Sequence, residues 1–350
     1  MRKVYTGLCI GIVAVLLASC AGSSYVSIQV LKPADISMPG VKTVAVVDFQ
    51  GQGRSGSQIA TLVQSMLLET QHFDILEREK ISRILEEKNM AMSGIVDNQT
   101  AIAAGSLLGV DALIFGEVTV YEVEPDQKMT RKVKEKKHTG KYQWVEEKDK
   151  KTGKMKRVRK EIVEDVWVER SYWVRKGTVA INYRVVDVNS GVLLAAYSDS
   201  RSYDSSNNQS YYSSSRSTQN SLKPKGEILN SLSRDLCSVF ARKIAPYYVN
   251  EKRVIEPGDG PIDAGKRYAE SGLWPEAIEA WEQALREMPG EPAGYYNLGV
   301  ALEITGELEN AEKAYKGAVQ LNPKKLYMDS LRRIRNAMRE RDELRNQMGQ

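Results

Sequence analysis

Val44-Ala45-Val46-Val47-Asp48-Phe49 opens the first folded domain that the sequence predicts. Its first four residues are apolar, which is typical of a strand covered on both faces. The glycine-rich turn Gly51-Gln52-Gly53-Arg54-Ser55-Gly56 follows. Apolar residues then recur at i, i+3, i+4, i+7 and i+8, which marks one stripe of an amphipathic helix: Ile59, Leu62, Val63, Met66 and Leu67. A buried strand followed by such a helix favours a layered α/β domain.

The alternation of strands and helices continues as far as residue 118. Residues 73–76 and 111–118 have strand composition, and Ile81–Leu85 carries a second helical pattern. Asp97 or Asn98 is a suitable N-cap for a third helix. This order of elements predicts the fold class α/β.

Longer strands are predicted after residue 120. Val179–Val186 alternates inward and outward residues, and Val192–Tyr197 is its expected hairpin partner. Residues 198–221 are rich in Ser, Asn and Tyr and have little to bury, so they predict a loop. An amphipathic helix follows over Ile228–Phe240.

Residues 126–176 form a basic insert in this domain. They contain 18 Lys or Arg and 9 Asp or Glu, a net charge of +9, while the whole chain has +5. Strand composition on both sides of Asp149–Lys154 predicts a long β-hairpin with its tip there. Both faces of its return strand carry charges, which favours a solvated hairpin over a membrane-spanning one. Its charge suits an anionic surface, with nucleic acid the least favoured partner.

The N-terminus has the pattern of an export signal over residues 1–19. Met1-Arg2-Lys3 precedes an apolar run from Val4 to Leu17, and Leu17-Ala18-Ser19-Cys20 resembles the lipobox of bacterial lipoproteins. The resemblance implies that Cys20 is the lipid attachment site and becomes the first mature residue. A plain secretory signal and an uncleaved anchor are the alternatives.

The export signal leads to predictions for the segment after it, for the cysteines and for the location of the protein. Residues 20–40 predict an extended tether, because Ser and Pro residues discourage a helix there. Cys9 lies in the signal, so Cys237 is the one thiol left over, and its apolar neighbours predict a buried side chain. Ala21-Gly22 behind the cysteine lacks the aspartate of an inner-membrane retention signal, which favours a lipid-anchored, periplasm-facing location at the outer membrane.

A second domain follows a predicted linker at residues 246–261. Within residues 262–325 the sequence repeats with a period of 34 residues, which resembles the tetratricopeptide repeat. The positions of the first copy are Gly265, Tyr268, Ala277, Trp281, Ala284 and Pro289, and those of the second are Gly299, Leu302, Ala311, Tyr315, Ala318 and Pro323. Residues 326–350 predict a helix that caps the last repeat. Such a module is expected to recruit a protein partner.

We find no pattern that requires an enzyme, a cofactor or a metal. Gly51, Gly53 and Gly56, with Glu77 about 20 residues on, outline a dinucleotide fingerprint, but three residues separate the apolar run from the first glycine. A structural turn is the favoured interpretation. His72 and His138 lack the neighbours of a zinc site or a catalytic triad, so we expect neither a metal site nor catalytic residues.

Several segments together resemble the CsgG family of curli secretion channel lipoproteins. They are the lipobox, residues 44–49, 76–87 and 108–118, and Val179–Gly191, and the resemblance spans roughly residues 41–245. It implies an α/β domain, an outer-membrane oligomer and a role in secretion or assembly of cell-surface material. Family channels take two hairpins per subunit, which would fall at residues 126–176 and 198–221. The alternative is an LpoB-like periplasmic adaptor that regulates cell-wall synthesis without a pore.

Overall fold

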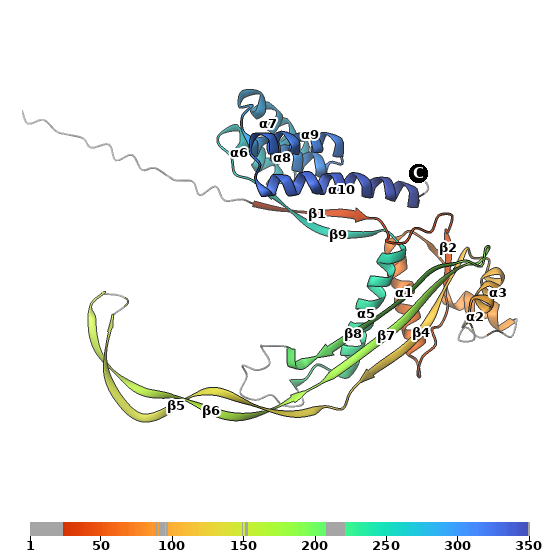
Figure 1. Cartoon of the computed structure of the whole chain (residues 1–350), viewed down its shortest axis with the longest axis horizontal. Helices are drawn as coiled ribbons and strands as arrows, with labels where there is room; N and C mark the ends of the chain where they lie inside the picture. Colours follow the sequence, from red (N-terminus) through yellow and green to blue (C-terminus); the bar gives the residue numbers. More distant parts are fainter. Residues whose placement is uncertain are drawn as a thin grey trace, which may run out of the picture. The chain divides into compact units, whose positions relative to one another are not determined.

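The computed structural model describes residues 24–348 except 88–89, 91–94, 96, 149, 151–152 and 208–220. The chain divides into two compact units (Figure 1). One unit is Ala34–Ala245, and the other joins the N-terminal segment up to Pro33 with Pro246–Gln350. Each unit is considered separately below.

The first unit is built on a five-stranded sheet in the order β3-β2-β4-β7-β8. Strands β3 (Asp74–Ile75), β2 (Thr43–Val46) and β4 (Ala112–Val123) run parallel to one another. Strands β7 (Lys176–Asp187) and β8 (Leu193–Asp204) continue the sheet in the antiparallel sense. The predicted α/β class is therefore confirmed.

Helices cover both faces of this sheet. Val44 and Val46 pack toward α1 (Ser55–Thr70) and α5 (Lys225–Ile244). Ala45 and Val47 point the other way, toward α2 (Arg78–Glu87) and α3 (Asn98–Leu108). All four strand residues are fully buried, because each face of β2 has its own layer of helices.

Of the two candidates Asp97 and Asn98, Asp97 is the N-cap of α3. Its carboxylate accepts a 2.8 Å hydrogen bond from the Thr100 amide. The Thr100 hydroxyl oxygen in turn accepts a 3.2 Å hydrogen bond from the Asp97 amide, which completes a reciprocal capping box. Gly109 ends the helix in the left-handed conformation, as a residue without a Cβ can do at no cost.

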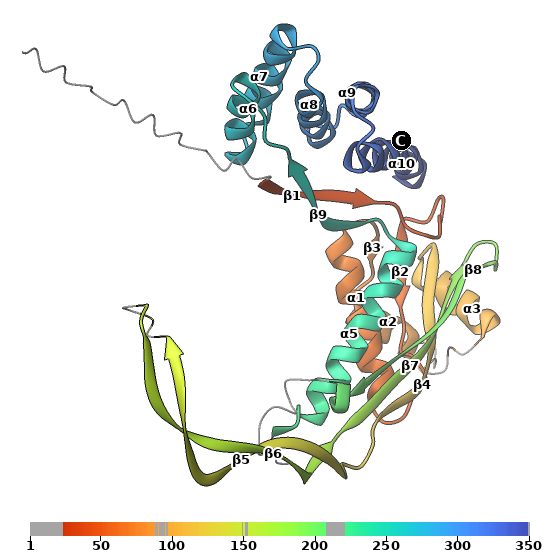
Figure 2. The ribbon, with the colours of Figure 1, turned by 60° about the vertical axis from the view of Figure 1, so that its left-hand side comes forward.

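The basic insert folds as the predicted hairpin. Strand β5 (Gln127–Lys148) pairs with β6 (Met155–Val174), and Figure 2 shows them as a twisted two-stranded ribbon. The register shifts between His138 and Tyr142, where Gly140 has a positive φ.

The serine-rich segment is only partly a loop. Residues 198–204 form the second half of β8, paired with β7, and the predicted loop residues 208–220 lie outside the described residues. The Ser-rich composition wrongly predicted a loop for residues 198–204. These residues can form a strand because β8 lies at the edge of the sheet, where Ser and Asp side chains stay in solvent.

The second unit corrects two further predictions. Residues 24–32 of the expected tether form strand β1 (Ser24–Lys32), and residues 247–255 of the expected linker form strand β9 (Tyr247–Ile255). The two strands pair antiparallel from Ser24↔Ile255 to Lys32↔Tyr247. We call this pair the anchor ribbon. Its strands come from opposite ends of the chain, and local composition does not reveal such a partner.

The repeats form two helical pairs followed by a longer helix. They are α6 (Pro261–Glu270), α7 (Trp274–Glu287), α8 (Pro292–Ile304), α9 (Leu308–Leu321) and α10 (Lys325–Met348). A Cβ on Gly299 would lie 2.7 Å from the Tyr315 ring, so glycine is required where α8 meets α9. Among the described residues, no helix combines the length and the apolarity needed to cross a bilayer.

Candidate protein-interaction site

The anchor ribbon lies against the helical repeats of its own unit. Its inward residues Val26 and Ile255 pack with the repeat core, which includes Trp281 and Tyr296. Outward residues such as Tyr25 and Tyr248 remain exposed. The alternation of strand side chains therefore gives the ribbon one face on the helices and one face in solvent.

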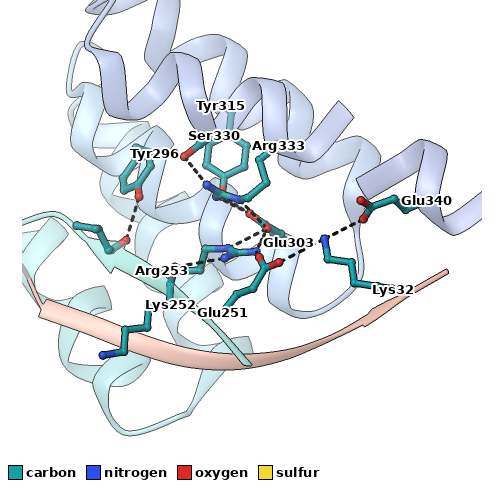
Figure 3. A network of polar contacts seen from close by, with 11 residues as sticks. Lys32, Glu251, Lys252, Arg253, Tyr296, Glu303, Tyr315, Ser330, Arg333 and Glu340 are labelled. Atoms are coloured by element: carbon teal, nitrogen blue, oxygen red, sulfur yellow. Dashed lines mark hydrogen bonds and ion pairs between the residues drawn. The ribbon is translucent and has the colours of Figure 1, made fainter. Parts of the chain in front are cut away.

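Glu303, at the end of α8, is the centre of a buried polar network (Figure 3). Its Oε1 accepts hydrogen bonds from Arg253 of β9 at 2.9 and 2.8 Å. Its Oε2 accepts hydrogen bonds from Arg333 of α10 at 2.9 Å and from the Tyr315 hydroxyl at 2.6 Å. The side chains of Glu303 and Arg253 are only 6% and 5% exposed. A buried carboxylate with this many donors joins the ribbon to α8, α9 and α10 at once.

The network holds Glu303 in its charged form. Burial by itself would raise the pKa of this carboxyl, but the hydrogen bond and charge of Arg333, the charge of Arg253 and the hydroxyl of Tyr315 lower it below its ordinary value. The net direction is downward because two guanidinium groups surround one carboxylate.

A second set of contacts fixes the end of β9. The Asn297 side chain accepts from the Glu256 amide and donates to the Glu256 carbonyl, both at 2.9 Å. The Glu256 carboxylate contacts Lys324 and the Tyr327 hydroxyl. The Tyr296 hydroxyl donates to the Val254 carbonyl at 3.1 Å. The outer edge of β9 at its C-terminal end is thus occupied by helix side chains.

These contacts change the predicted role of residues 262–325. The ribbon is held against α8 and α10 through the Arg253–Glu303–Arg333 contacts, so this part of the repeat surface is already covered. At its other end, Lys32 of β1 pairs with Glu251 of β9 and Glu340 of α10 at 3.3 and 2.9 Å. A partner must therefore bind beside the ribbon or displace it.

The hairpin presents a different kind of surface. Paired residues of antiparallel strands share a face, so Tyr142, Trp144, Arg157 and Arg159 lie together near the distal end. The Arg159 guanidinium is 4.3 Å from the centre of the Tyr142 ring. Trp144 is 67% exposed. Large aromatic side chains that are this exposed, next to cationic side chains, indicate an interaction surface.

The glycine loop is explained by packing. The Gln50 amide donates to the Gly116 carbonyl at 2.8 Å, and the Val118 amide donates to the Gln50 carbonyl at 2.7 Å, so the loop is joined to β4. A Cβ on Gly56 would lie 1.7 Å from the Phe49 carbonyl oxygen. Glu77 and the glycines therefore belong to the connections around β2 and β3.

The remaining candidate residues lie apart from one another. The His72 and Phe73 rings pack edge to face, with their centres 4.5 Å apart, and burial lowers the pKa of His72. His138 pairs with Glu161 on the hairpin at 2.8 Å. Within the part of the chain that the structure describes, no group of three His, Cys, Asp or Glu side chains could hold a metal ion.

Of the two cysteines considered above, the structure describes Cys237 but not Cys20. Cys237 is fully buried, as predicted, and burial raises the pKa of its thiol to about 12, so it is inert at neutral pH. Cys20, the expected lipid attachment site, lies outside the described residues.

The sequence did not predict the importance of Arg253, Glu256 and Glu303. One signal was available: Glu303 stands between Leu302 and Ile304 at the end of an otherwise apolar helix. A charged residue in that position needs a partner, but the sequence does not show that the partner is a strand.

Comparisons with known proteins agree with the two-part organisation. The family described as curli production assembly/transport component CsgG matches residues 34–129, and a tetratricopeptide-repeat family matches residues 262–325. Residues 130–245 of the expected resemblance lie outside the matched range. A search of curated proteins returned no match.

Solved structures with a similar fold are distant. They include the PelC dodecamer from Paraburkholderia phytofirmans (12% identity, 63% of this chain, 99% of that chain, TM-score 0.28). The LpoB C-terminal domain from Salmonella enterica has 8% identity, 48% and 87% coverage, and a TM-score of 0.27. Lipoprotein GNA1162 from Neisseria meningitidis has 13% identity, 56% and 97% coverage, and a TM-score of 0.29. TM-scores this low support no conclusion about this chain.

The family matches and the described geometry coincide: the first falls on the β2–β4 half of the sheet, and the second on helices α6 to α9. The chain therefore carries a CsgG-family domain at residues 34–129, followed by tetratricopeptide repeats at residues 262–325.

Proposed function

We propose that this protein is a non-enzymatic lipoprotein of the CsgG type. It acts as an oligomer in the secretion or assembly of cell-surface material, and its repeat module recruits a protein partner. The observation that carries this proposal is the presence of a CsgG-family domain and a tetratricopeptide-repeat module in one chain. The first supplies the transport-type scaffold, and the second supplies the recruiting surface.

Lipid on Cys20 would place the protein at the outer membrane, facing the periplasm. Strand β1 begins at Ser24, so only three residues separate it from the lipid-bearing cysteine. Four backbone steps span at most about 14 Å. Because β1 is fixed to the repeats through the anchor ribbon, the same lipid would hold the repeat module close to the membrane.

The hairpin would contact an anionic surface, with lipid headgroups as the favoured one. Its strands carry charges on both faces, and a charge in the middle of a bilayer costs roughly 2–4 kcal/mol for Arg. Tyr and Trp beside Lys and Arg suit the boundary between headgroups and water instead. A transmembrane pore is accordingly not part of the proposal.

A deletion strain tests the proposed function. We expect one or more surface components to disappear from the cell exterior and to accumulate in the periplasm, as measured by comparative proteomics of the two fractions. The wild-type gene should restore export, and the Cys20→Ala variant should not, because it cannot be lipidated. Unchanged surface and periplasmic fractions would contradict the proposal.

Particle size tests the oligomeric part independently. The detergent-extracted native protein should have a protein mass that is a multiple of the chain mass, as measured by light scattering coupled to size-exclusion chromatography. A particle with the mass of one chain, up to 39.2 kDa, would remove oligomerisation from the proposed function.

A further inference from the structure

The anchor ribbon has one occupied edge and one open edge. The Val254 carbonyl of β9 and both backbone groups of Glu256, which directly follows β9, bind side chains of α8. On β1, no backbone hydrogen bond within the described chain reaches the edge that faces away from β9. An open strand edge is a ready template for another strand.

The register identifies which groups on that edge are available. In an antiparallel pair, directly opposite residues alternate between bonded and non-bonded positions. The Val254 carbonyl points away from β1, so the pair Tyr25↔Val254 is non-bonded. The alternation then makes Ser27, Gln29 and Leu31 non-bonded as well. Each directs its N–H and C=O away from β9.

A cleft of about 420 Å³ borders β1. Six consecutive residues, Ser27–Lys32, line one wall, together with the inward-facing Glu251 and Arg253 of β9. The cleft therefore extends from β1 beneath the inward face of the ribbon. Its length along β1 is about 20 Å.

The opposite wall is a helical stripe. Arg333, Ala337, Glu340, Arg341 and Leu344 recur along α10 at spacings of one turn, and Ile304 and Leu308 add an apolar floor. The Nε of Arg341 is buried and makes no hydrogen bond among the described residues, although Asp342 Oδ1 lies 3.6 Å away. The cleft therefore combines strand backbone groups, apolar side chains and charged side chains.

We propose that this cleft binds an extended segment of a partner protein, which adds to β1 as a third strand of the anchor ribbon. The segment would present apolar side chains toward Ile304, Leu308 and Leu344, and polar side chains toward solvent. Backbone hydrogen bonds to Ser27, Gln29 and Leu31 give affinity, and the apolar floor selects alternating sequences. The assignment rests on the proposed recruiting role of the repeat module and names the chemistry of its partner.

Gln29→Pro tests the cleft most directly. Proline removes the outward N–H at the middle of the edge, and an edge strand tolerates it where the N–H faces away from the sheet. Asn250→Pro is the matched control, because Asn250 pairs with Gln29 and its N–H lies on the opposite edge of the same ribbon. Ala337→Trp is an independent variant that fills the cleft from α10 and leaves the strand unchanged.

The probe is a fluorescein-labelled nonapeptide of alternating valine and threonine with lysine at both ends. It is titrated by fluorescence anisotropy with the chain from residue 21 onward, which contains every described residue. We expect saturable binding that Gln29→Pro and Ala337→Trp weaken at least tenfold, while Asn250→Pro stays within twofold of wild type. Absence of saturable binding, or equal binding by wild type and Ala337→Trp, would overturn the proposal.

The result is separable from the proposed function. Export that depends on the protein, together with no peptide binding, would remove the cleft and leave the function in place. Peptide binding that responds to the variants, with normal export in the deletion strain, would keep the cleft and remove the function.

Discussion

The anchor ribbon and the β5–β6 hairpin are both two-stranded antiparallel ribbons, but they differ in how much of their surface is buried. A two-stranded ribbon alone is marginally stable in water, because it lacks a hydrophobic face to bury. The anchor ribbon buries one face on helices of its own unit, with Ile255 fully buried. The hairpin leaves Trp144 and Trp167 about two-thirds exposed. The first ribbon has its partner within the chain, and the second lacks one among the described residues.

This difference separates structural charge from functional charge. Arg253 is buried and donates to the buried carboxylate of Glu303, so its loss would remove one of the two guanidinium groups that compensate this charge in the interior. The basic residues of the hairpin are solvated, so they are available for long-range attraction of an anionic surface. Similar side chains therefore stabilise one ribbon and equip the other for binding.

Glu303→Gln should produce the largest effect on stability. It leaves Arg333 without a carboxylate partner among the described residues and Arg253 with Glu251 alone, and breaking a buried ion pair costs about 3–5 kcal/mol. Urea denaturation followed by circular dichroism at 222 nm measures the loss. Glu340→Gln is the control, because it removes a partly exposed carboxylate of α10 that pairs with Lys32 of the same ribbon, and it should cost about 1 kcal/mol or less. Equal losses for the two variants would contradict the buried role of Glu303.

The same carboxylate predicts a pH dependence. Its pKa is lower in the folded protein than in the unfolded chain, so its stabilisation is fully present above the unfolded pKa and is lost as pH falls through the folded value. The urea midpoint of the wild type should therefore fall between about pH 5 and pH 3. Glu303→Gln should show a smaller decrease over that interval. An identical decrease would mean that other carboxylates cause it.

Trp144→Ser should change binding rather than folding. A surface substitution usually alters stability by no more than about 0.5 kcal/mol. If the exposed aromatic face meets headgroups, losing this side chain should weaken binding to vesicles of phosphatidylcholine and phosphatidylglycerol about tenfold, since burying a large apolar side chain is worth roughly 1.5–3 kcal/mol. Co-sedimentation of the unlipidated chain from residue 21 measures it.

Two controls define that result. Trp167→Ser removes an equally exposed tryptophan nearer the base of the hairpin and should have the smaller effect if the distal end makes the contact. Binding should also weaken as salt is added, because exposed charges are screened. Binding that neither salt nor Trp144→Ser affects would mean that the hairpin is not the membrane contact.

Local patterns were sufficient to predict much of this fold. Val44–Val47 is buried on both faces, as an apolar run flanked by helices requires. The 34-residue spacing assigned Gly299 and Tyr315 to the second repeat, and in the structure the Tyr315 ring packs directly against Gly299. Even the hairpin followed from strand composition on both sides of a turn.

Pairing between distant segments could not be predicted in this way. Val26, Ile28 and Val30 alternate as a strand should, but serine and proline nearby favoured a tether, and their partner strand lies beyond the whole first unit. The Glu303 network depends on that pairing, since it takes Arg253 from the ribbon and Arg333 from α10. A buried carboxylate becomes interpretable only when the donors that surround it are known.

The smallest effect should come from Arg170→Gln on the hairpin, and it sharpens the comparison most. Arg170 donates to both carboxylate oxygens of Glu135, at 2.7 and 2.8 Å, which is the bidentate geometry. Arg253 instead donates from two nitrogens to a single oxygen of Glu303. Arg170 also lowers the pKa of Glu135. The pair is nevertheless exposed to water, which screens it and hydrates each partner when the other is lost. We expect no measurable shift in the urea midpoint for Arg170→Gln and a large one for Arg253→Gln, measured side by side. Comparable shifts would mean that geometry, rather than burial, decides what an arginine–glutamate pair contributes to these ribbons.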